Sequence, residues 1–74
     1  TITGKTLELE EIIHELCRLL KDEDSQVRIN TALALMKTEA VSSISNLHEA
    51  LSLEGNDQAK SVIKVAINQL EKIG

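Results

Sequence analysis

The residues best suited to chemistry are two His-Glu dipeptides, His14-Glu15 and His48-Glu49. An imidazole nitrogen and a carboxylate oxygen are both suitable ligands for iron. Neighbouring residues on a helix point about 100° apart, so one dipeptide does not hold a metal ion alone. The two pairs also fall at different positions of the internal repeat described below. We therefore expect no metal site.

A thiol and an imidazole lie three residues apart at Cys17 and His14, a spacing that suits zinc ligands on one helix face. A structural zinc ion takes four ligands, and no second closely spaced pair accompanies these two. Cys17 is the single cysteine and forms no disulfide within the chain, and no base with an orienting partner stands near it. We expect no catalytic residue and no cofactor.

The charge and composition argue against some classes of partner. The chain has 74 residues, a formal net charge of -4 and no aromatic residue. Binding to nucleic acid usually needs a basic patch and stacking side chains, so we expect no nucleic-acid partner. The sequence shows neither a signal peptide nor a long apolar run, which predicts no membrane partner and an intracellular protein, cytoplasmic rather than nuclear.

The elements that must position these residues are predicted to be four helices. The first is expected from about Leu7 to Leu20, after a flexible tail that ends with Thr6 as the helix cap. The second begins after Asp24 or Ser25 and ends near Met36, the third follows a Thr38 cap and ends near Leu53, and the fourth begins at Asn56 or Asp57. No segment alternates with a period of two, so the class is all-α. The first helix should bury one apolar stripe, formed by Leu9, Ile12, Ile13, Leu16, Leu19 and Leu20.

The second helix is apolar on nearly every side, which predicts a central position. We expect its stripe of Ile29, Leu33 and Met36 to be buried against the third and fourth helices. The alternative is that this stripe lies exposed as a groove for a partner. A shift of 35 residues places polar residues at the same positions of the last helix, which favours a solvent-facing C-terminal cap there. These positions are Lys64, Asn68 and Glu71.

The chain contains an internal repeat of about thirty residues. The first and third helices match at a shift of 31, where Ile13, Leu16 and Leu20 correspond to Ile44, Leu47 and Leu51. The second and fourth helices match at a shift of 35, because the second hairpin has a longer loop. We expect a single domain over residues 1–74, with repeat one at about 7–37 and repeat two at about 38–74, as a fragment of a longer protein.

The stretch from Leu20 to Leu35 resembles HEAT repeats, especially the short HEAT-like repeats of phycobilisome lyases. The residues that carry the resemblance are Asp24, Val27-Arg28, Thr31-Ala32 and Ala34-Leu35. The resemblance covers about residues 9–74 and is weaker in the second repeat, where Ile63 replaces the arginine. It implies two antiparallel helical hairpins stacked as a short right-handed α-solenoid. It also implies that Asp24 and Arg28 are structural polar residues between repeats.

The function expected from this resemblance is non-catalytic. We predict a protein–protein interaction or scaffold module that is not an enzyme and binds another protein. A possible partner surface lies on the last helix at Lys60, Lys64 and Asn68. The alternative is a fragment or accessory subunit of a HEAT-repeat enzyme, either lyase-like or like the metal-dependent hydroxylases. In those hydroxylases His-Glu pairs bind iron from the second helix of a repeat, whereas both pairs here lie in first helices.

Overall fold

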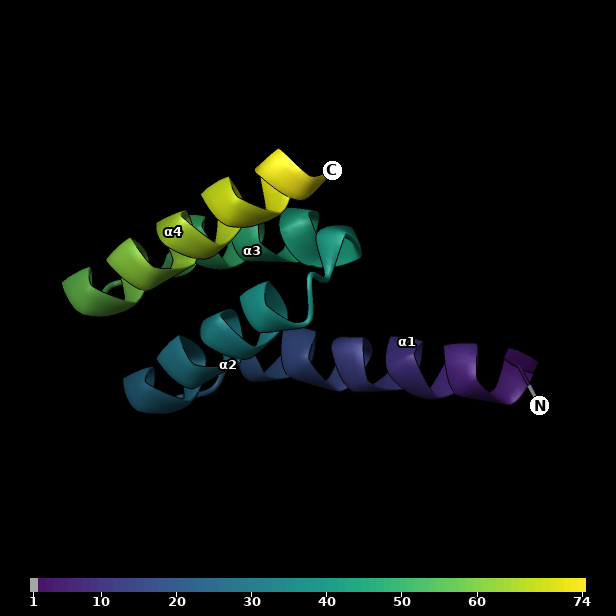
Figure 1. The fold of residues 1–74 in the computed structure, drawn as a ribbon. Helices are drawn as coiled ribbons and strands as arrows, with labels where there is room; N and C mark the ends of the chain where they lie inside the picture. The colour runs from purple at the N-terminus through teal and green to yellow at the C-terminus, as the bar shows by residue number, and fades with distance from the viewer. Residues whose placement is uncertain (1) are drawn as a thin grey trace.

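The computed structural model describes the backbone of residues 2–74 and the side chains of residues 10–74. It contains the helices α1 (Ile2–Leu19), α2 (Ser25–Lys37), α3 (Ile44–Leu53) and α4 (Asp57–Ile73), and a short 3-10 helix, η1 (Val41–Ser43), before α3. Residues 2–74 include no strand. The predicted all-α class is therefore confirmed, with two antiparallel helical hairpins stacked on each other (Figure 1).

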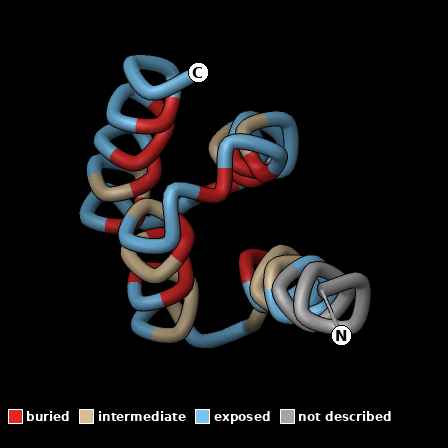
Figure 2. The backbone as a smooth tube through the Cα atoms, turned by 45° about the vertical axis from the view of Figure 1, so that its right-hand side comes forward, coloured by how far each residue is buried: buried red, intermediate tan, exposed pale blue. Residues whose placement is uncertain are grey.

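The helices form two layers. α1 and α3 run in one direction and α2 and α4 run in the opposite direction (Figure 1). Viewed from the side, α2 and α4 form one layer, and α1 and α3 are seen nearly end-on in the other (Figure 2). α2 packs against both α1 and α4. The central position predicted for the second helix is thus confirmed.

The core lies between these layers, where the buried residues gather on the inner sides of the helices (Figure 2). Alanine is frequent among them, and small side chains let helix axes approach closely. Burial of the aliphatic side chains supplies the main stabilising free energy, at about 25 cal/mol for each Å² removed from water. The buried cluster consists of Leu20, Ala32, Leu35, Ala40, Leu47, Ala50, Ile63, Ala66, Ile67 and Leu70.

Two helices begin at one of the two caps that the sequence offers for each of them. Asp24 Oδ1 accepts a hydrogen bond of 2.8 Å from the backbone N–H of Gln26 at the start of α2. Asn56 Oδ1 accepts one of 3.0 Å from the N–H of Ala59 at the start of α4. Each bond satisfies a donor that has no partner inside the helix.

The predicted start of the first helix is wrong. α1 begins at Ile2, so residues 2–6 are helical instead of forming a tail capped by Thr6. No proline interrupts this segment. A single glycine within a helix, here Gly4, costs only about 1 kcal/mol relative to alanine, so it does not by itself end the pattern.

The predicted Thr38 cap of the third helix is also wrong. Thr38 ends α2, and its hydroxyl donates to the carbonyl oxygens of Ala34 at 3.0 Å and Leu35 at 3.2 Å. Glu39 follows with a φ of 55°, the left-handed conformation that commonly ends a helix. The chain then enters η1 before α3, so the third helical segment starts at Val41.

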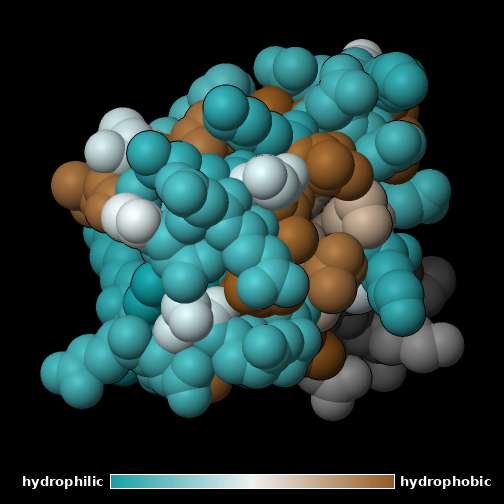
Figure 3. All heavy atoms as spheres, turned by 90° about the vertical axis from the view of Figure 1, so that its left-hand side faces the viewer, coloured by the Kyte–Doolittle hydropathy of each residue, from teal (hydrophilic) through white to brown (hydrophobic). Residues whose placement is uncertain are grey.

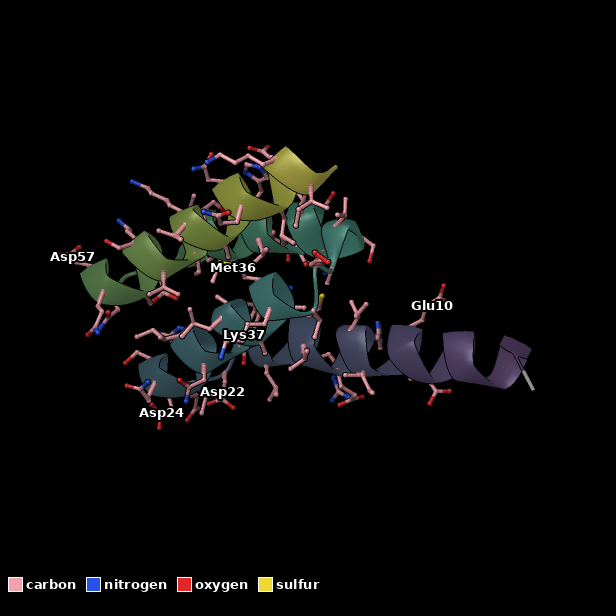
Figure 4. All side chains as sticks on the ribbon, viewed as in Figure 1. Glu10, Asp22, Asp24, Met36, Lys37 and Asp57 are labelled. Carbon is pink, nitrogen blue, oxygen red and sulfur yellow. The ribbon has the colours of Figure 1, made fainter. Side chains whose placement is uncertain are left out.

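The burial of the two predicted stripes differs. On α2, Ile29 is buried and Leu33 and Met36 are half-buried, and Met36 lies on the side toward α3 and α4 (Figure 4). On α1, Ile12 and Leu19 are 54% and 40% exposed. The stripe on α2 is therefore an internal surface, whereas burial of the whole α1 stripe is contradicted. Leu9 lies outside the residues whose side chains are described.

None of the helices found in residues 2–74 has the length and apolar character needed to cross a bilayer.

Candidate functional site

The two hairpins are joined at their loop ends by an ion pair between Arg28 and Glu54. Arg28 Nε and Nη2 donate to Glu54 Oε1 and Oε2 at 2.7 and 2.8 Å, which makes the pair bidentate. The carboxylate side chain is 1% exposed and the guanidinium side chain 18% exposed. Bidentate charge-assisted bonds of this kind are the strong and directional ones.

The same two side chains also bind the backbone of the turn after α1 and of the loop before α4. Arg28 Nη1 donates to the carbonyl oxygens of Asp22 at 2.6 Å and Glu23 at 3.0 Å, in the turn after α1. Glu54 Oε2 accepts from the N–H of Asn56 at 3.1 Å, in the loop before α4. Arg28 and Glu54 therefore connect the α1–α2 turn, α2 and the α3–α4 loop.

The electrostatics keep this pair ionised. The hydrogen bonds from Arg28 lower the pKa of Glu54 although burial opposes this, and the same bonds raise the pKa of Arg28. The lowered pKa keeps the Glu54 carboxyl deprotonated near neutral pH, so it is poorly suited to act as a general acid. The pair ties the two hairpins together.

The two residues expected to bridge the repeats are placed differently. Arg28 contacts the second hairpin through Glu54. Asp24 caps α2 instead, close to Asp22 at the loop end of the molecule (Figure 4). Sequence reasoning missed Glu54, which it treated only as a helix stop, because no local pattern links residues 26 positions apart. Most of the molecular face at this loop end is hydrophilic (Figure 3).

A groove between α1 and α3 gathers the side chains with the most varied chemistry. It consists of two adjoining shallow hollows, which share His14, Cys17 and Asn46. We call it the α1–α3 groove. Its remaining lining residues are Glu10, Ile13, Arg18, Lys21 and Ser42.

The two cations that line this groove, Lys21 and Arg18, each form an ion pair. Lys21 Nζ lies 2.6 Å from Glu49 Oε1 and bridges the turn after α1 to α3. Its hydrogen bond and charge lower the pKa of the Glu49 carboxyl. Arg18 Nη1 donates to Glu15 Oε1 at 3.0 Å on the same helix. These pairs are exposed, so both cations can exchange partners at little cost.

The thiol in the groove is not activated. Burial raises the pKa of Cys17, so at neutral pH the sulfur is protonated. The groove is lined by groups that can form hydrogen bonds, namely an imidazole, a carboxamide, an ammonium group and a guanidinium group, beside the apolar side chain of Ile13. The sequence brought His14 and Cys17 together, but only the fold adds Ser42 and Asn46.

The His-Glu dipeptides do not converge. His48 Nε2 lies 3.7 Å from Glu71 Oε2, and both side chains are exposed. Among the side chains of residues 10–74, no three His, Cys, Asp or Glu groups lie close enough to hold one metal ion. His14 is in the α1–α3 groove, on the other hairpin.

The predicted partner surface lies on α4. Lys64 and Asn68 are exposed and Lys60 is half-buried. Its role in binding remains a prediction.

Comparison with known proteins gives one informative match. No family model matches the chain, and no solved structure matches it significantly. Over 71 residues, 96% of the chain, it is 52% identical to the bilin biosynthesis protein MpeU of Synechococcus sp. (strain WH8020). Those residues make up 24% of that protein, so the chain spans about a quarter of the length of the curated relative it matches.

This match contradicts the expectation of a non-catalytic scaffold that is not an enzyme. The relative is named for a biosynthetic role, which fits the alternative of a segment of an enzyme. The error arose because the helical repeat by itself carries no chemistry, and function was inferred from the fold alone.

Proposed function

We propose that this chain is a HEAT-like helical-repeat segment of an enzyme of bilin biosynthesis, lyase-like in class, that acts on a bilin together with a protein partner. The observation that carries the proposal is the 52% identity to a bilin biosynthesis protein along almost the whole chain. The repeated hairpins and the HEAT-like residues around Arg28 support the architectural part.

The α1–α3 groove is the part of the segment that we assign to bilin contact. A bilin is an open-chain tetrapyrrole with propionate carboxylates and ring N–H groups. Lys21 and Arg18 supply charge-assisted donors for the propionates, and Ile13 supplies an apolar wall for the rings. The exposed carboxylate of Glu10, which also lines the groove, suits the ring N–H groups.

Titration with biliverdin tests this assignment. Free biliverdin interconverts between mirror-image helical conformers, so binding to a chiral site produces a circular-dichroism band in the visible range. We expect such a band with the wild-type chain. Lys21→Met should weaken the binding about tenfold, as the loss of one charge-assisted bond predicts.

The matched control is Lys72→Met, which removes the same charge from α4, away from the groove, and should leave the binding unchanged. No visible band with the wild-type chain, or equal losses in both variants, would overturn the assignment of bilin contact to this groove.

A further inference from the structure

A further hollow continues the α1–α3 groove beyond Lys21, where the loop ends of the two hairpins meet. It has a volume of about 300 Å³, and we call it the junction hollow. Lys21 lines both this hollow and the α1–α3 groove. The residues that η1 and α3 contribute to the successive hollows recur at spacings of four and three, namely Ser42, Asn46, Ala50 and Leu53. The three hollows therefore lie in series along one side of α3.

The junction hollow has an apolar floor and no net charge. Leu20 and Ala50 are buried and form the floor, and Leu53, which is 71% exposed, stands at the rim. Two cations and two carboxylates complete most of the lining, and their charges cancel: Lys21, Arg28, Asp22 and Glu54. A lining of this kind suits a neutral polar group on an apolar body better than it suits a further ion.

One donor and one acceptor that line the junction hollow make no hydrogen bond within residues 10–74. Four of the five N–H groups of the Arg28 guanidinium donate to Glu54 and to backbone carbonyls, which leaves one N–H on Nη2. Asp22 Oδ1 accepts from the backbone N–H of Asp24 at 2.9 Å, which leaves Oδ2. A donor and an acceptor in one hollow complement a secondary amide, which presents one C=O and one N–H.

We propose that the junction hollow binds a terminal lactam ring of the bilin, an inference that rests on the proposed function of the α1–α3 groove. The propionates of a bilin are on its inner rings, and its outer rings are neutral lactams. When Lys21 binds a propionate, the adjoining outer ring reaches the junction hollow. There Arg28 donates to the lactam carbonyl, Asp22 accepts from the lactam N–H, and Leu20 and Ala50 contact the ring.

The bilin is bound in an extended conformation, because the hollows lie in series. Lys21 exchanges Glu49 for the propionate, which costs little because this ion pair is exposed. A propionate in the junction hollow fits less well, since the carboxylates of Asp22 and Glu54 would repel it.

Biliverdin absorption tests the conformation and the rim of the hollow. Free biliverdin is coiled, and its visible band gains intensity relative to its near-ultraviolet band when the molecule becomes extended. We expect this gain on binding to the wild-type chain. Leu53→Asn removes the apolar rim without a change of charge and should weaken binding about fivefold and reduce the gain. Val65→Asn, at a position 51% exposed on α4, is the control and should change neither quantity.

A second pair of variants distinguishes a lactam from a propionate in the junction hollow. Asp22→Asn removes a charge but keeps an oxygen that can accept from the N–H of Asp24. A lactam N–H bound to the carboxylate predicts binding about fivefold weaker, whereas a propionate in the hollow predicts tighter binding. Glu23→Gln, in the same turn but outside the lining, is the control.

Unchanged or tighter binding by Asp22→Asn would overturn the proposal, as would equal effects of Leu53→Asn and Val65→Asn or the band ratio of free biliverdin in the wild-type complex. If the wild-type chain still gives a visible circular-dichroism band that Lys21→Met weakens, such a result removes the terminal-ring site alone. Absence of that band in the wild-type chain would overturn the bilin contact and the terminal-ring site together.

Discussion

At the scale of single residues, Arg28 and Glu54 dominate the structure. From α2, Arg28 reaches both the α1–α2 turn and Glu54 with one rigid planar group, which a lysine ammonium cannot do in the same way. Glu54 is buried and is satisfied by Arg28 and the backbone N–H of Asn56. An ionised group buried in this manner is stable only while its partners stay in place.

Removal of one charge from this pair should therefore destabilise the fold. Glu54→Gln keeps the shape but loses the bidentate ion pair, and we expect a loss of about 1–3 kcal/mol in the free energy of unfolding. Urea unfolding followed by far-ultraviolet circular dichroism measures it. Glu49→Gln, which breaks the exposed pair with Lys21, should cost less than about 1 kcal/mol. Equal costs would contradict the role given to Glu54.

The free energy of unfolding at acid pH should also depend on the carboxylate of Glu54. Arg28 lowers the pKa of Glu54 in the folded chain below that of the unfolded chain. The resulting stabilisation is present above the unfolded pKa and is lost as pH falls through the folded pKa. The difference in unfolding free energy between wild type and Glu54→Gln should thus be largest near pH 7 and become smaller as the pH falls. A difference that stays constant with pH would exclude this linkage.

At the scale of elements, polar caps and a left-handed residue set where the helices begin and end. Asp24 and Asn56 each accept a backbone N–H in the first turn of their helices. Glu39, at a φ of 55°, separates α2 from η1. The loop lengths that follow determine how the second hairpin lies on the first.

Loss of a cap should cost a moderate amount of stability. Asp24→Ala and Asn56→Ala are each expected to lower the free energy of unfolding by about 0.5–2 kcal/mol. Glu23→Ala, an exposed acid in the same turn as Asp24, should change it by no more than about 0.5 kcal/mol. Chemical denaturation of the three variants gives the comparison, and an effect of Glu23→Ala as large as that of Asp24→Ala would show that charge, not capping, matters.

At the scale of the whole molecule, the side chains of α1 and α3 are buried to different extents. Leu47 on α3 is fully buried, while Ile12 on α1 is more than half exposed. The groove between α1 and α3 also depends on how the two hairpins lie together, because its lining residues come from both of them.

Truncation of Leu47 and of Ile12 to alanine should show how much each side chain contributes to stability. Leu47→Ala removes a fully buried side chain and should cost about 2–5 kcal/mol. Ile12→Ala in the 74-residue chain should cost less than about 1 kcal/mol, since little buried area is lost. Thermal or urea unfolding distinguishes the two, and a cost for Ile12→Ala close to that for Leu47→Ala would mean that its side chain is covered in solution.

The sequence alone was sufficient for the all-α class, the two helical hairpins and the central second helix, and it placed the caps of α2 and α4 to within one residue, because periodicity and capping are local properties of the chain. It was not sufficient for the Arg28–Glu54 pair, the α1–α3 groove or the exposure of Ile12 and Leu19. Each of these depends on how one hairpin lies on the other, so tertiary packing decides it: a helix pattern shows which face is apolar, but not how much of that face a neighbour covers.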